Sequence, residues 1–278
     1  MKTYFYNKTV LITGATSGIG ESIAYNLANK GASLILTGRN EDKLKKVKCK
    51  CENIYEKSKH KNSDNEEKII ERIRTYKCDM SNLDSINSFV KFIKKGDFPD
   101  IFILNAGISQ RSLSLDTDID VDRKLMDVNY FSGVYFIKCF KEELKKAKLT
   151  QIAVTTSISG LFGFPLRSAY CASKHALHGF YESLDLENDN IKVTFLVPGR
   201  INTPISMSAI LNDGTKYNKM DSGQAHGMNV DKCASIAVRA IRKRKHIKLI
   251  GNIELIMAYF HKYCPWLFWI LAKKVSAK

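Results

Sequence analysis

The sequence predicts a single α/β domain, a doubly wound parallel sheet of about seven strands in the order 3-2-1-4-5-6-7 with helices on both faces. Three observations predict it. Short apolar runs rich in β-branched residues alternate with longer segments of helical periodicity. The apolar runs are nearly continuous, as in strands buried on both faces. A glycine-rich turn joins the first run to the first helical segment. We expect strands at residues 8–13, 33–37, 74–78, 101–104, 151–156, 191–197 and 246–250.

The elements between these strands are consistent with one domain. The first helix carries Ile19, Ile23 and Leu27 on one face, and Gly31 ends it. Neither an internal repeat nor an interdomain linker is visible. We expect residues 1–250 to form the domain and residues 251–278 to form its tail.

The composition is that of a soluble globular protein, with 44% apolar and 26% charged residues. The net charge of +16 is unusual, because so basic a surface attracts phosphates, anionic thioesters, nucleic acid or anionic lipid. The lysines are scattered, however, so we interpret them mainly as solubilising residues. The polar segment 56–68 is expected to be a solvated helix end and a loop. It nearly lacks aromatic residues, so we expect no nucleic-acid partner.

The seven cysteines indicate reduced thiols, because their number is odd and most stand alone in the sequence. The spacing of Cys49 and Cys51 is too short for a zinc pair, and we expect no metal site. No secretory signal precedes the first strand. We therefore expect a cytoplasmic protein.

The glycine turn predicts a dinucleotide site. It reads Thr13-Gly14-x-x-x-Gly18-Ile19-Gly20 and lies between a strand and a helix. A turn of this kind needs glycines for its sharp bend and for close approach of a pyrophosphate to the helix N-terminus. The turn residues expected to hold the dinucleotide are Gly14, Thr16, Ser17, Gly18, Ile19 and Gly20.

Arg39, at the end of the second strand, indicates which dinucleotide is bound. An acidic residue there would bond the ribose 2′-hydroxyl of NAD, whereas a guanidinium suits the 2′-phosphate of NADP. We therefore favour NADP(H) over NAD(H).

Tyr170 and Lys174 are four residues apart, so on a helix they share one face. A nearby ammonium lowers the pKa of a tyrosine, which makes the phenol a usable proton donor. Ser157 lies thirteen residues earlier, at the end of the fifth strand, where its hydroxyl could hold a substrate oxygen. Together with the glycine turn, these residues predict hydride transfer between a nicotinamide and a carbonyl, with Tyr170 donating the proton.

In these motifs, over residues 8 to 204, the chain resembles the short-chain dehydrogenases/reductases. The resemblance implies that Asp79 holds the adenine, that Asn129 anchors a water relay to Lys174, and that Ser157, Tyr170 and Lys174 are catalytic. It also implies homodimers or homotetramers. The segment from Asp213 to Gly227 resembles the member 7 subgroup of that family. Further cofactor contacts implied by the resemblance are Met80, Asn105, Ala106, Gly107, Pro198, Gly199, Ile201 and Thr203.

The substrate is expected to be a lipophilic ketone, aldehyde or matching alcohol. In the family, the region corresponding to residues 204–229 is a lid, and here it contains flexible methionines. The expected substrate contacts are Ser157, Leu161, Phe162, Phe164, Tyr170 and Met207. Two alternatives stay open: a reductase of 3-oxoacyl thioesters on a carrier protein or CoA, and a non-catalytic NADP(H) sensor or scaffold.

The segment 259–274 is rich in aromatic residues and ends in lysines. Its uninterrupted apolar run is far shorter than the roughly 20 residues of a bilayer span. Tryptophans beside lysines are typical of helices that lie in the membrane interface. Peripheral membrane contact, packing against a second subunit and internal packing are the three alternatives for this tail.

Overall fold

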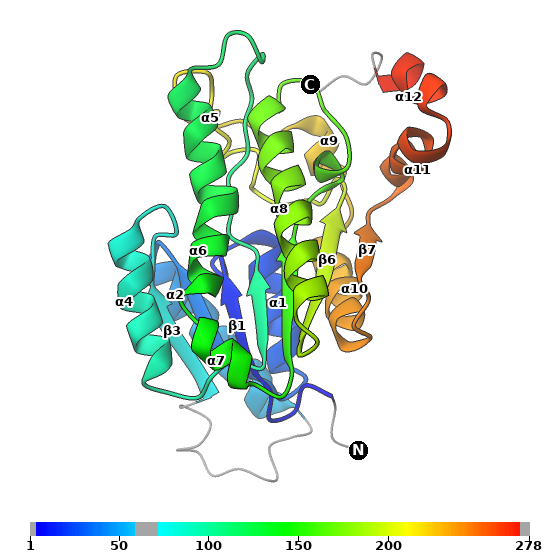
Figure 1. The fold of residues 1–278 in the computed structure, drawn as a ribbon. Helices are drawn as coiled ribbons and strands as arrows, with labels where there is room; N and C mark the ends of the chain where they lie inside the picture. Colours follow the sequence, from blue (N-terminus) through cyan, green and yellow to red (C-terminus); the bar gives the residue numbers. More distant parts are fainter. Residues whose placement is uncertain (1–3, 59–71, 273–278) are drawn as a thin grey trace.

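The computed structural model describes residues 4–58 and 72–272 and confirms the expected sheet. Seven parallel strands lie in the order β3-β2-β1-β4-β5-β6-β7 (Figure 1). Each strand begins and ends within one residue of its expected range. The bounds are β1 (Thr9–Thr13), β2 (Ser33–Gly38), β3 (Ile73–Lys77), β4 (Ile101–Leu104), β5 (Thr150–Thr155), β6 (Ile191–Pro198) and β7 (Ile247–Ile250).

Alternate residues of the strands point to two separate cores, one on each face of the sheet. In β1, Val10 and Ile12 belong to one core and Leu11 to the other. The same alternation divides Ile103 from Phe102 in β4. Side chains of successive strand residues point to opposite faces, so a strand buried on both faces must be apolar at every position.

Helices cover both cores. One layer contains α1 (Gly18–Ala28), α2 (Glu41–Lys57) and α10 (Val230–Arg242). The other contains α4 (Leu83–Lys94), α6 (Ser132–Lys138), α7 (Lys141–Lys146) and α8 (Ser168–Glu187). The side chains of Asn40, Asn82 and Asn229 cap the first turns of α2, α4 and α10. Shorter elements are α5 (Ile119–Met126), α9 (Ser222–Ala225), a π-helical turn (Asp127–Phe131) and 3₁₀ turns at Ile158–Gly160 and Ile253–Leu255.

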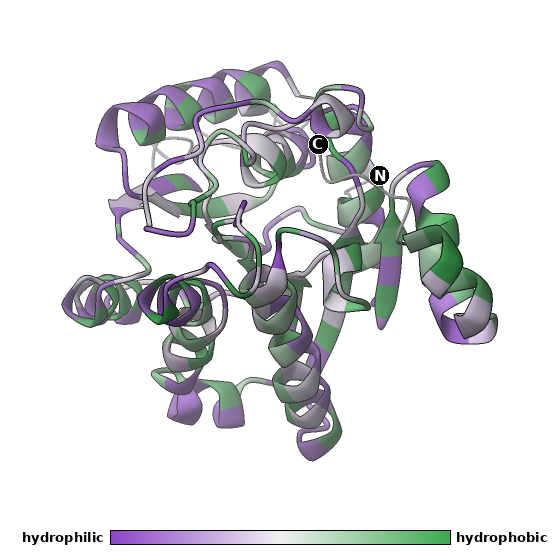
Figure 2. Ribbon diagram, turned by 90° about the horizontal axis from the view of Figure 1, so that it is seen from above, coloured by the Kyte–Doolittle hydropathy of each residue, from purple (hydrophilic) through white to green (hydrophobic). Residues whose placement is uncertain are grey.

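The loops that follow the strands gather at one edge of the sheet, onto which Figure 2 looks. The strand order reverses between β1 and β4. In sheets of this kind, ligands bind outside the carboxyl ends of the strands at such a switch point.

The tail forms α11 (Ile256–Tyr263) and α12 (Pro265–Ala272), which lie to one side of the sheet (Figure 1). Phe268 is buried, and its ring centroid lies 5.1 Å from that of Phe162. Trp266 and Trp269, by contrast, are 67% and 62% exposed. Internal packing therefore accounts for Phe268, while contact of the exposed tryptophans with a membrane or a second subunit stays a prediction.

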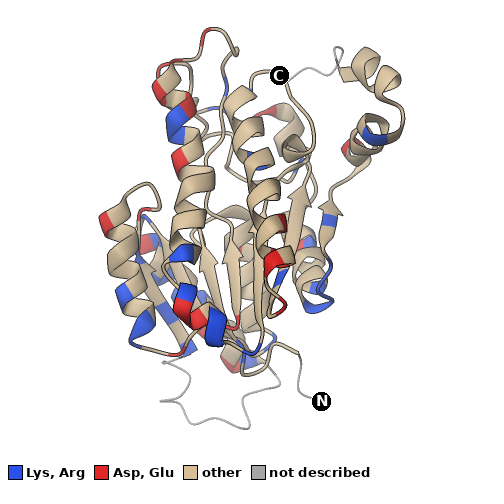
Figure 3. Cartoon of the chain, in the orientation of Figure 1, with Lys and Arg blue, Asp and Glu red and all other residues tan. Residues whose placement is uncertain are grey.

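No described helix has the length and apolarity that crossing a bilayer requires. Lysines 273 and 274, and residues 59–68 of the polar segment, lie outside the described residues. Figure 3 shows Lys and Arg on many elements of the described chain, whereas α12 carries no charged residue.

Candidate active site

Helix α8 brings Tyr170 and Lys174 together, as their spacing predicted. Both side chains are buried, and the Lys174 Nζ lies 5.8 Å from the centroid of the Tyr170 ring. Lys174 Nζ also donates a hydrogen bond of 2.9 Å to the carbonyl oxygen of Thr155, at the end of β5. The lysine is thus tied to the strand that precedes Ser157.

Gln110 determines where α8 begins. Its Oε1 accepts hydrogen bonds from the backbone N–H groups of Ala169 (3.0 Å) and Tyr170 (3.3 Å). Its Nε2 donates to the hydroxyl of Ser112 at 3.0 Å. A fully buried amide therefore satisfies two donors of the first turn that the helix itself cannot satisfy. Sequence reasoning missed Gln110, because nothing near it in the chain indicates a partner some sixty residues away.

Ser157 lies two residues after the end of β5, within hydrogen-bonding reach of Tyr170. Its Oγ accepts a hydrogen bond of 3.1 Å from the Ser159 N–H, which begins a 3₁₀ turn. A hydrogen bond from Ser157 also acts to lower the pKa of the Tyr170 phenol. The expected pair of hydroxyls is therefore in place.

The charges that act most on Tyr170 are not the expected ones. Burial raises the pKa of Tyr170 above its ordinary value, and the charges of Arg167 and Arg111 act to lower it. The ammonium of Lys174 was expected to have this role, but burial lowers the pKa of Lys174 itself to about 8. Desolvation is thus the largest effect on the pKa of the phenol, and the charges of the two arginines offset part of it.

Asn129 lies in the π-helical turn between α5 and α6, a local irregularity common at functional sites. Its Oδ1 accepts from the Ile108 N–H (2.8 Å), and its Nδ2 donates to the Ile108 carbonyl oxygen and the Ser173 hydroxyl (both 3.0 Å). A Cβ at Gly107 would lie 3.0 Å from Asn129 Oδ1 and 3.5 Å from Lys174 Nζ. Asn129 is therefore adjacent to Lys174, and the water relay stays a prediction.

The glycine turn is braced by β4. Gly14 and Gly18 have φ angles of 65° and 57°, which favour glycine. Asn105 Nδ2 donates to the carbonyl oxygen of Gly14 at 3.2 Å, and Thr13 Oγ1 accepts from the Asn105 and Ala106 N–H groups. A Cβ at Gly20 would collide with the Gly14 carbonyl oxygen and with Asn105 Nδ2. The Ser17 side chain makes no capping hydrogen bond to the first turn of α1.

A cleft of about 420 Å³ joins the turn to Tyr170. Arg39 lines this cleft, and so does Lys43, which sequence reasoning missed. Asp79 is close to Arg39: burial acts to raise the pKa of its carboxyl, but hydrogen bonds from Ser81 and the charge of Arg39 lower it below the ordinary value. The expected residues that line this cleft are Ser17, Gly18, Ile19, Arg39, Asn105, Gly107, Tyr170, Lys174, Pro198, Thr203 and Met207.

The remaining expected cofactor residues are not among those that line the cleft. Met80 and Ala106 line a small cavity with Asn129 and Lys174. Ile201 is buried, and its carbonyl oxygen accepts a hydrogen bond from Gln224. The methyl of Thr16 packs so closely on Gly38 that a Cβ there would approach to 2.6 Å.

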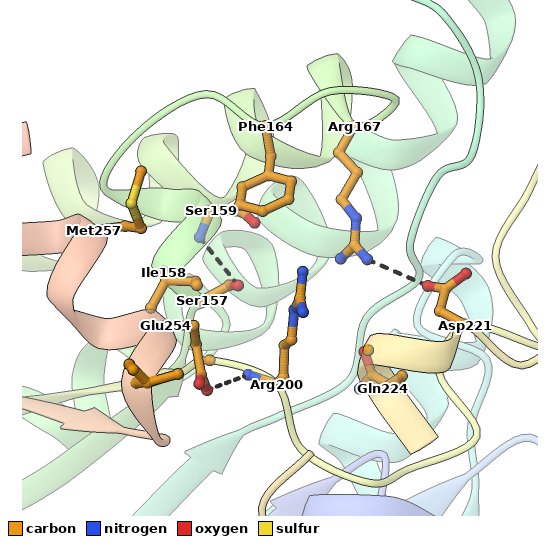
Figure 4. Close-up of a pocket in the computed structure, with 13 residues that line it drawn as sticks. Ser157, Ile158, Ser159, Phe164, Arg167, Arg200, Asp221, Gln224, Glu254 and Met257 are labelled. Carbon is orange, nitrogen blue, oxygen red and sulfur yellow. Dashed lines mark hydrogen bonds and ion pairs between the residues drawn. The ribbon is translucent and has the colours of Figure 1, made fainter. Parts of the chain in front are cut away.

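A second pocket, of about 290 Å³, opens beside Ser157 (Figure 4). Consecutive residues line the two cavities: Thr156 and Pro198 face the cleft, whereas Ser157 and Gly199 face the pocket. Phe164 lines the pocket as expected. Other residues of the pocket are Ile158, Arg167, Arg200, Asp221, Gln224, Ile253, Glu254 and Met257.

Three of the expected substrate contacts lie elsewhere. Leu161 and Phe162 are not among the residues that line either cavity, because the 3₁₀ turn after Ser157 directs the chain back toward the core. Phe162 packs on Phe268 of α12 and on His261. Met207 lines the cleft rather than the pocket.

Asp221 connects the segment before α10 to the start of α8. It forms a two-point contact with Arg111, and its Oδ2 accepts a hydrogen bond of 3.4 Å from Arg167. Burial lowers the pKa of Arg111 to about 10, so this guanidinium stays charged near neutral pH. Buried charges are tolerated when paired in this way.

Comparison with known proteins identifies the family. A family model described as short chain dehydrogenase matches residues 8–213, and the chain belongs to the short-chain dehydrogenase/reductase family. It is 34% identical to dehydrogenase/reductase SDR family member 7B of Xenopus laevis, over 99% of this chain and 84% of that protein. It is 33% identical to human member 7, over 95% of this chain and 76% of that protein.

Solved structures share the fold at lower identity. A Burkholderia phymatum short-chain dehydrogenase in complex with NAD superposes with a TM-score of 0.76, at 18% identity over 95% of this chain and 96% of that one. One from Sphingobium yanoikuyae in complex with NADPH gives 0.74, at 19% identity over 98% and 97%.

The bracing of the turn leads to a stability prediction. Gly14→Ala should reduce the free energy of unfolding by about 1.5 kcal/mol or more, because alanine is strained at positive φ and its Cβ would lie 2.9 Å from the Ala106 Cα. The matched control is Gly179→Ala in α8, where a Cβ meets no atom within 4 Å and should stabilise by about 0.8 kcal/mol. Urea unfolding measures both; effects of the same sign would contradict the proposed strain.

Proposed function

We propose that this protein is an NADP(H)-dependent oxidoreductase that interconverts a lipophilic ketone or aldehyde and its alcohol by hydride transfer, with Tyr170 as proton donor and acceptor. The observation that carries the proposal is the position of Tyr170. Its buried phenol lies beside Ser157 and Lys174, on the wall of a cleft that begins at the glycine turn.

The cleft residues suit a nicotinamide dinucleotide. The start of α1 offers backbone N–H groups and a partial positive charge to a pyrophosphate. Arg39 and Lys43 place two cations on the wall of the cleft near the end of β2, which supports NADP(H). The names of the similar structures mention both NAD and NADPH, so the preference rests on these two side chains.

The proton chemistry follows from the surroundings of Tyr170. The bound nicotinamide would supply or accept the hydride. Ser157 would hold the substrate oxygen while Tyr170 transfers its proton to that oxygen. Arg167 and Arg111 stabilise the phenolate that this transfer leaves. Lys174, anchored on Thr155, would bond the nicotinamide ribose, and Asn129 would hold the water through which Lys174 exchanges protons with solvent.

The proposal extends to the organisation of the chain. Residues 1–250 would bind the cofactor, with residues 204–229 as a lid, and residues 251–278 would be a tail of the same domain. A cytoplasmic location remains part of the proposal, as do peripheral membrane contact of the tail and a homodimer or homotetramer.

Turnover tests the proposal directly. NADPH oxidation should occur with a panel of ketones and aldehydes and should fall by about 10²-fold or more in Tyr170→Phe, because the proton donor is lost. The measurement is the near-ultraviolet absorbance of NADPH. Faster turnover of acetoacetyl thioesters would instead favour the 3-oxoacyl thioester reductase. Tight NADPH binding without turnover on any substrate would favour the sensor or scaffold.

The cofactor preference has its own test. Arg39→Ala should weaken NADPH binding about tenfold and leave NADH binding nearly unchanged, because only NADPH carries the 2′-phosphate. Titration of cofactor fluorescence gives both dissociation constants. Lys45→Ala removes one charge from the exposed face of α2 and is the control. Equal effects of Arg39→Ala on the two cofactors would contradict the assignment of Arg39.

Cofactor binding should depend on pH through Lys174. Because burial lowers the pKa of Lys174 to about 8, its ammonium loses a proton as pH rises through that value. The dissociation constant for NADPH should therefore rise several-fold between about pH 7 and pH 9. Tyr170→Phe should show the same rise, and Lys174→Arg, which stays charged, should not. A rise that disappears in Tyr170→Phe would assign the titration to the phenol instead.

A further inference from the structure

The pocket beside Ser157 contains more positive charge than its own carboxylates neutralise. Arg167 and Arg200 line it, and Arg111 is paired with Asp221 of the same pocket. The two carboxylates that line the pocket, Asp221 and Glu254, thus face three guanidinium groups. Both carboxylate oxygens of Asp221 accept hydrogen bonds from Arg111, and its Oδ2 also accepts one from Arg167. One aspartate thus serves two guanidinium groups.

Arg200 is the guanidinium without an acid partner. No hydrogen bond or ion pair joins its side chain to any residue in the described parts of the chain. The nearest candidate, Glu254, accepts instead from the backbone N–H groups of Arg200 (2.8 Å) and Asn252 (3.1 Å). The side chain is half-buried, and Figure 4 shows it extending into the pocket between Ser157 and Arg167.

Two features of the local backbone determine where this guanidinium lies. The carbonyl oxygen of Arg200 accepts from the Met228 N–H at 2.8 Å. A Cβ at Gly223 would lie 2.8 Å from Arg200 Nη1, so the absence of a side chain there makes room for the guanidinium. Its charge also adds to the effect of burial in lowering the pKa of Arg167. Two cations that repel each other thus face the same pocket.

We propose that Arg200 and Arg167 bind an oxyanion of the substrate, a carboxylate or a phosphate monoester, in the pocket beside Ser157. A guanidinium presents a planar fork of donors that matches both groups. The hydrocarbon part of the substrate would lie against Phe164, Met257 and Ile253. This inference rests on the proposed function, and it narrows the substrate from a lipophilic carbonyl compound to an amphipathic one with an anionic group.

The test compares substrates that differ only in charge. The full chain is supplied with NADPH and a series of straight-chain keto acids, their methyl esters, and phosphate monoesters of hydroxyketones of similar length. The wild type should prefer the best anion over its neutral match by about tenfold or more in kcat/KM. The anion that gives the larger ratio, carboxylate or phosphate, identifies the group bound.

Variants assign the preference to the pocket. Arg200→Gln should bring the anion-to-neutral ratio close to one, while Arg200→Lys should retain part of it. Gly223→Ala keeps the guanidinium but displaces it, and should also lower the ratio. Arg242→Gln, at the exposed end of α10, makes the same change in net charge and should leave the ratio unchanged. Circular dichroism of each variant checks that it folds.

The outcomes separate this inference from the proposed function. Turnover of neutral ketones that needs Tyr170, with an anion-to-neutral ratio near one in the wild type, would overturn the oxyanion subsite alone. If no substrate is turned over, the proposed function fails. Calorimetry of the keto acid and of its methyl ester with the free chain then tests the oxyanion subsite by itself. Tighter binding of the acid that is lost in Arg200→Gln supports the subsite, and equal binding overturns it.

Discussion

The contact between the ends of β1 and β4 is the constraint on which the rest of the site depends. The hydroxyl of Thr13 accepts from two backbone N–H groups at Asn105 and Ala106, and the Asn105 side chain returns hydrogen bonds to the carbonyl oxygens of Thr13 and Gly14. These hydrogen bonds join the ends of β1 and β4, between which the strand order reverses. The glycine turn follows β1 on one side of this contact. On the other side, Asn129 is hydrogen-bonded to Ile108, which lies three residues after Asn105.

The fold and the centre of the site could be predicted because their signals are local. Strands buried on both faces must be apolar throughout, so each is visible as a short run. Tyr170 and Lys174 are one helical turn apart, and the glycine turn is one contiguous segment. Residues that act from a distance could not be predicted. Gln110, Arg111 and Asp221 reach α8 through loops, and no periodicity marks a loop residue that caps or neutralises another element.

Phe162 shows how the local fold separates side chains that are close in sequence. It lies five residues after Ser157, yet the 3₁₀ turn between them directs its ring to Phe268 in the tail. The other residues of the pocket come partly from the segment after Ser157, which supplies Phe164 and Arg167, and partly from α9 and the segments that follow β6 and β7. Arg200 and Glu254 are far from Ser157 in the sequence, so no local pattern places their charges beside it.

Buried arginines give the site two electrostatic functions at once. Arg167 stabilises the phenolate of Tyr170 and also faces the pocket. Any anion placed near Arg167 therefore changes the field at the proton donor as well as the affinity of the pocket. In the proposed mechanism, anion binding and proton transfer would be coupled through Arg167.

The walls of the pocket have a consequence for how such chains diverge. The family model matches residues 8–213, whereas Asp221, Gln224, Glu254 and Met257 of the pocket all come after it. The proposed catalytic residues thus lie within the matched region, whereas the walls of the pocket come from both that region and the last quarter of the chain. Mutations in the last quarter would change one side of the pocket and leave the proposed catalytic residues unaltered, so the reactant could change while the proposed chemistry is kept.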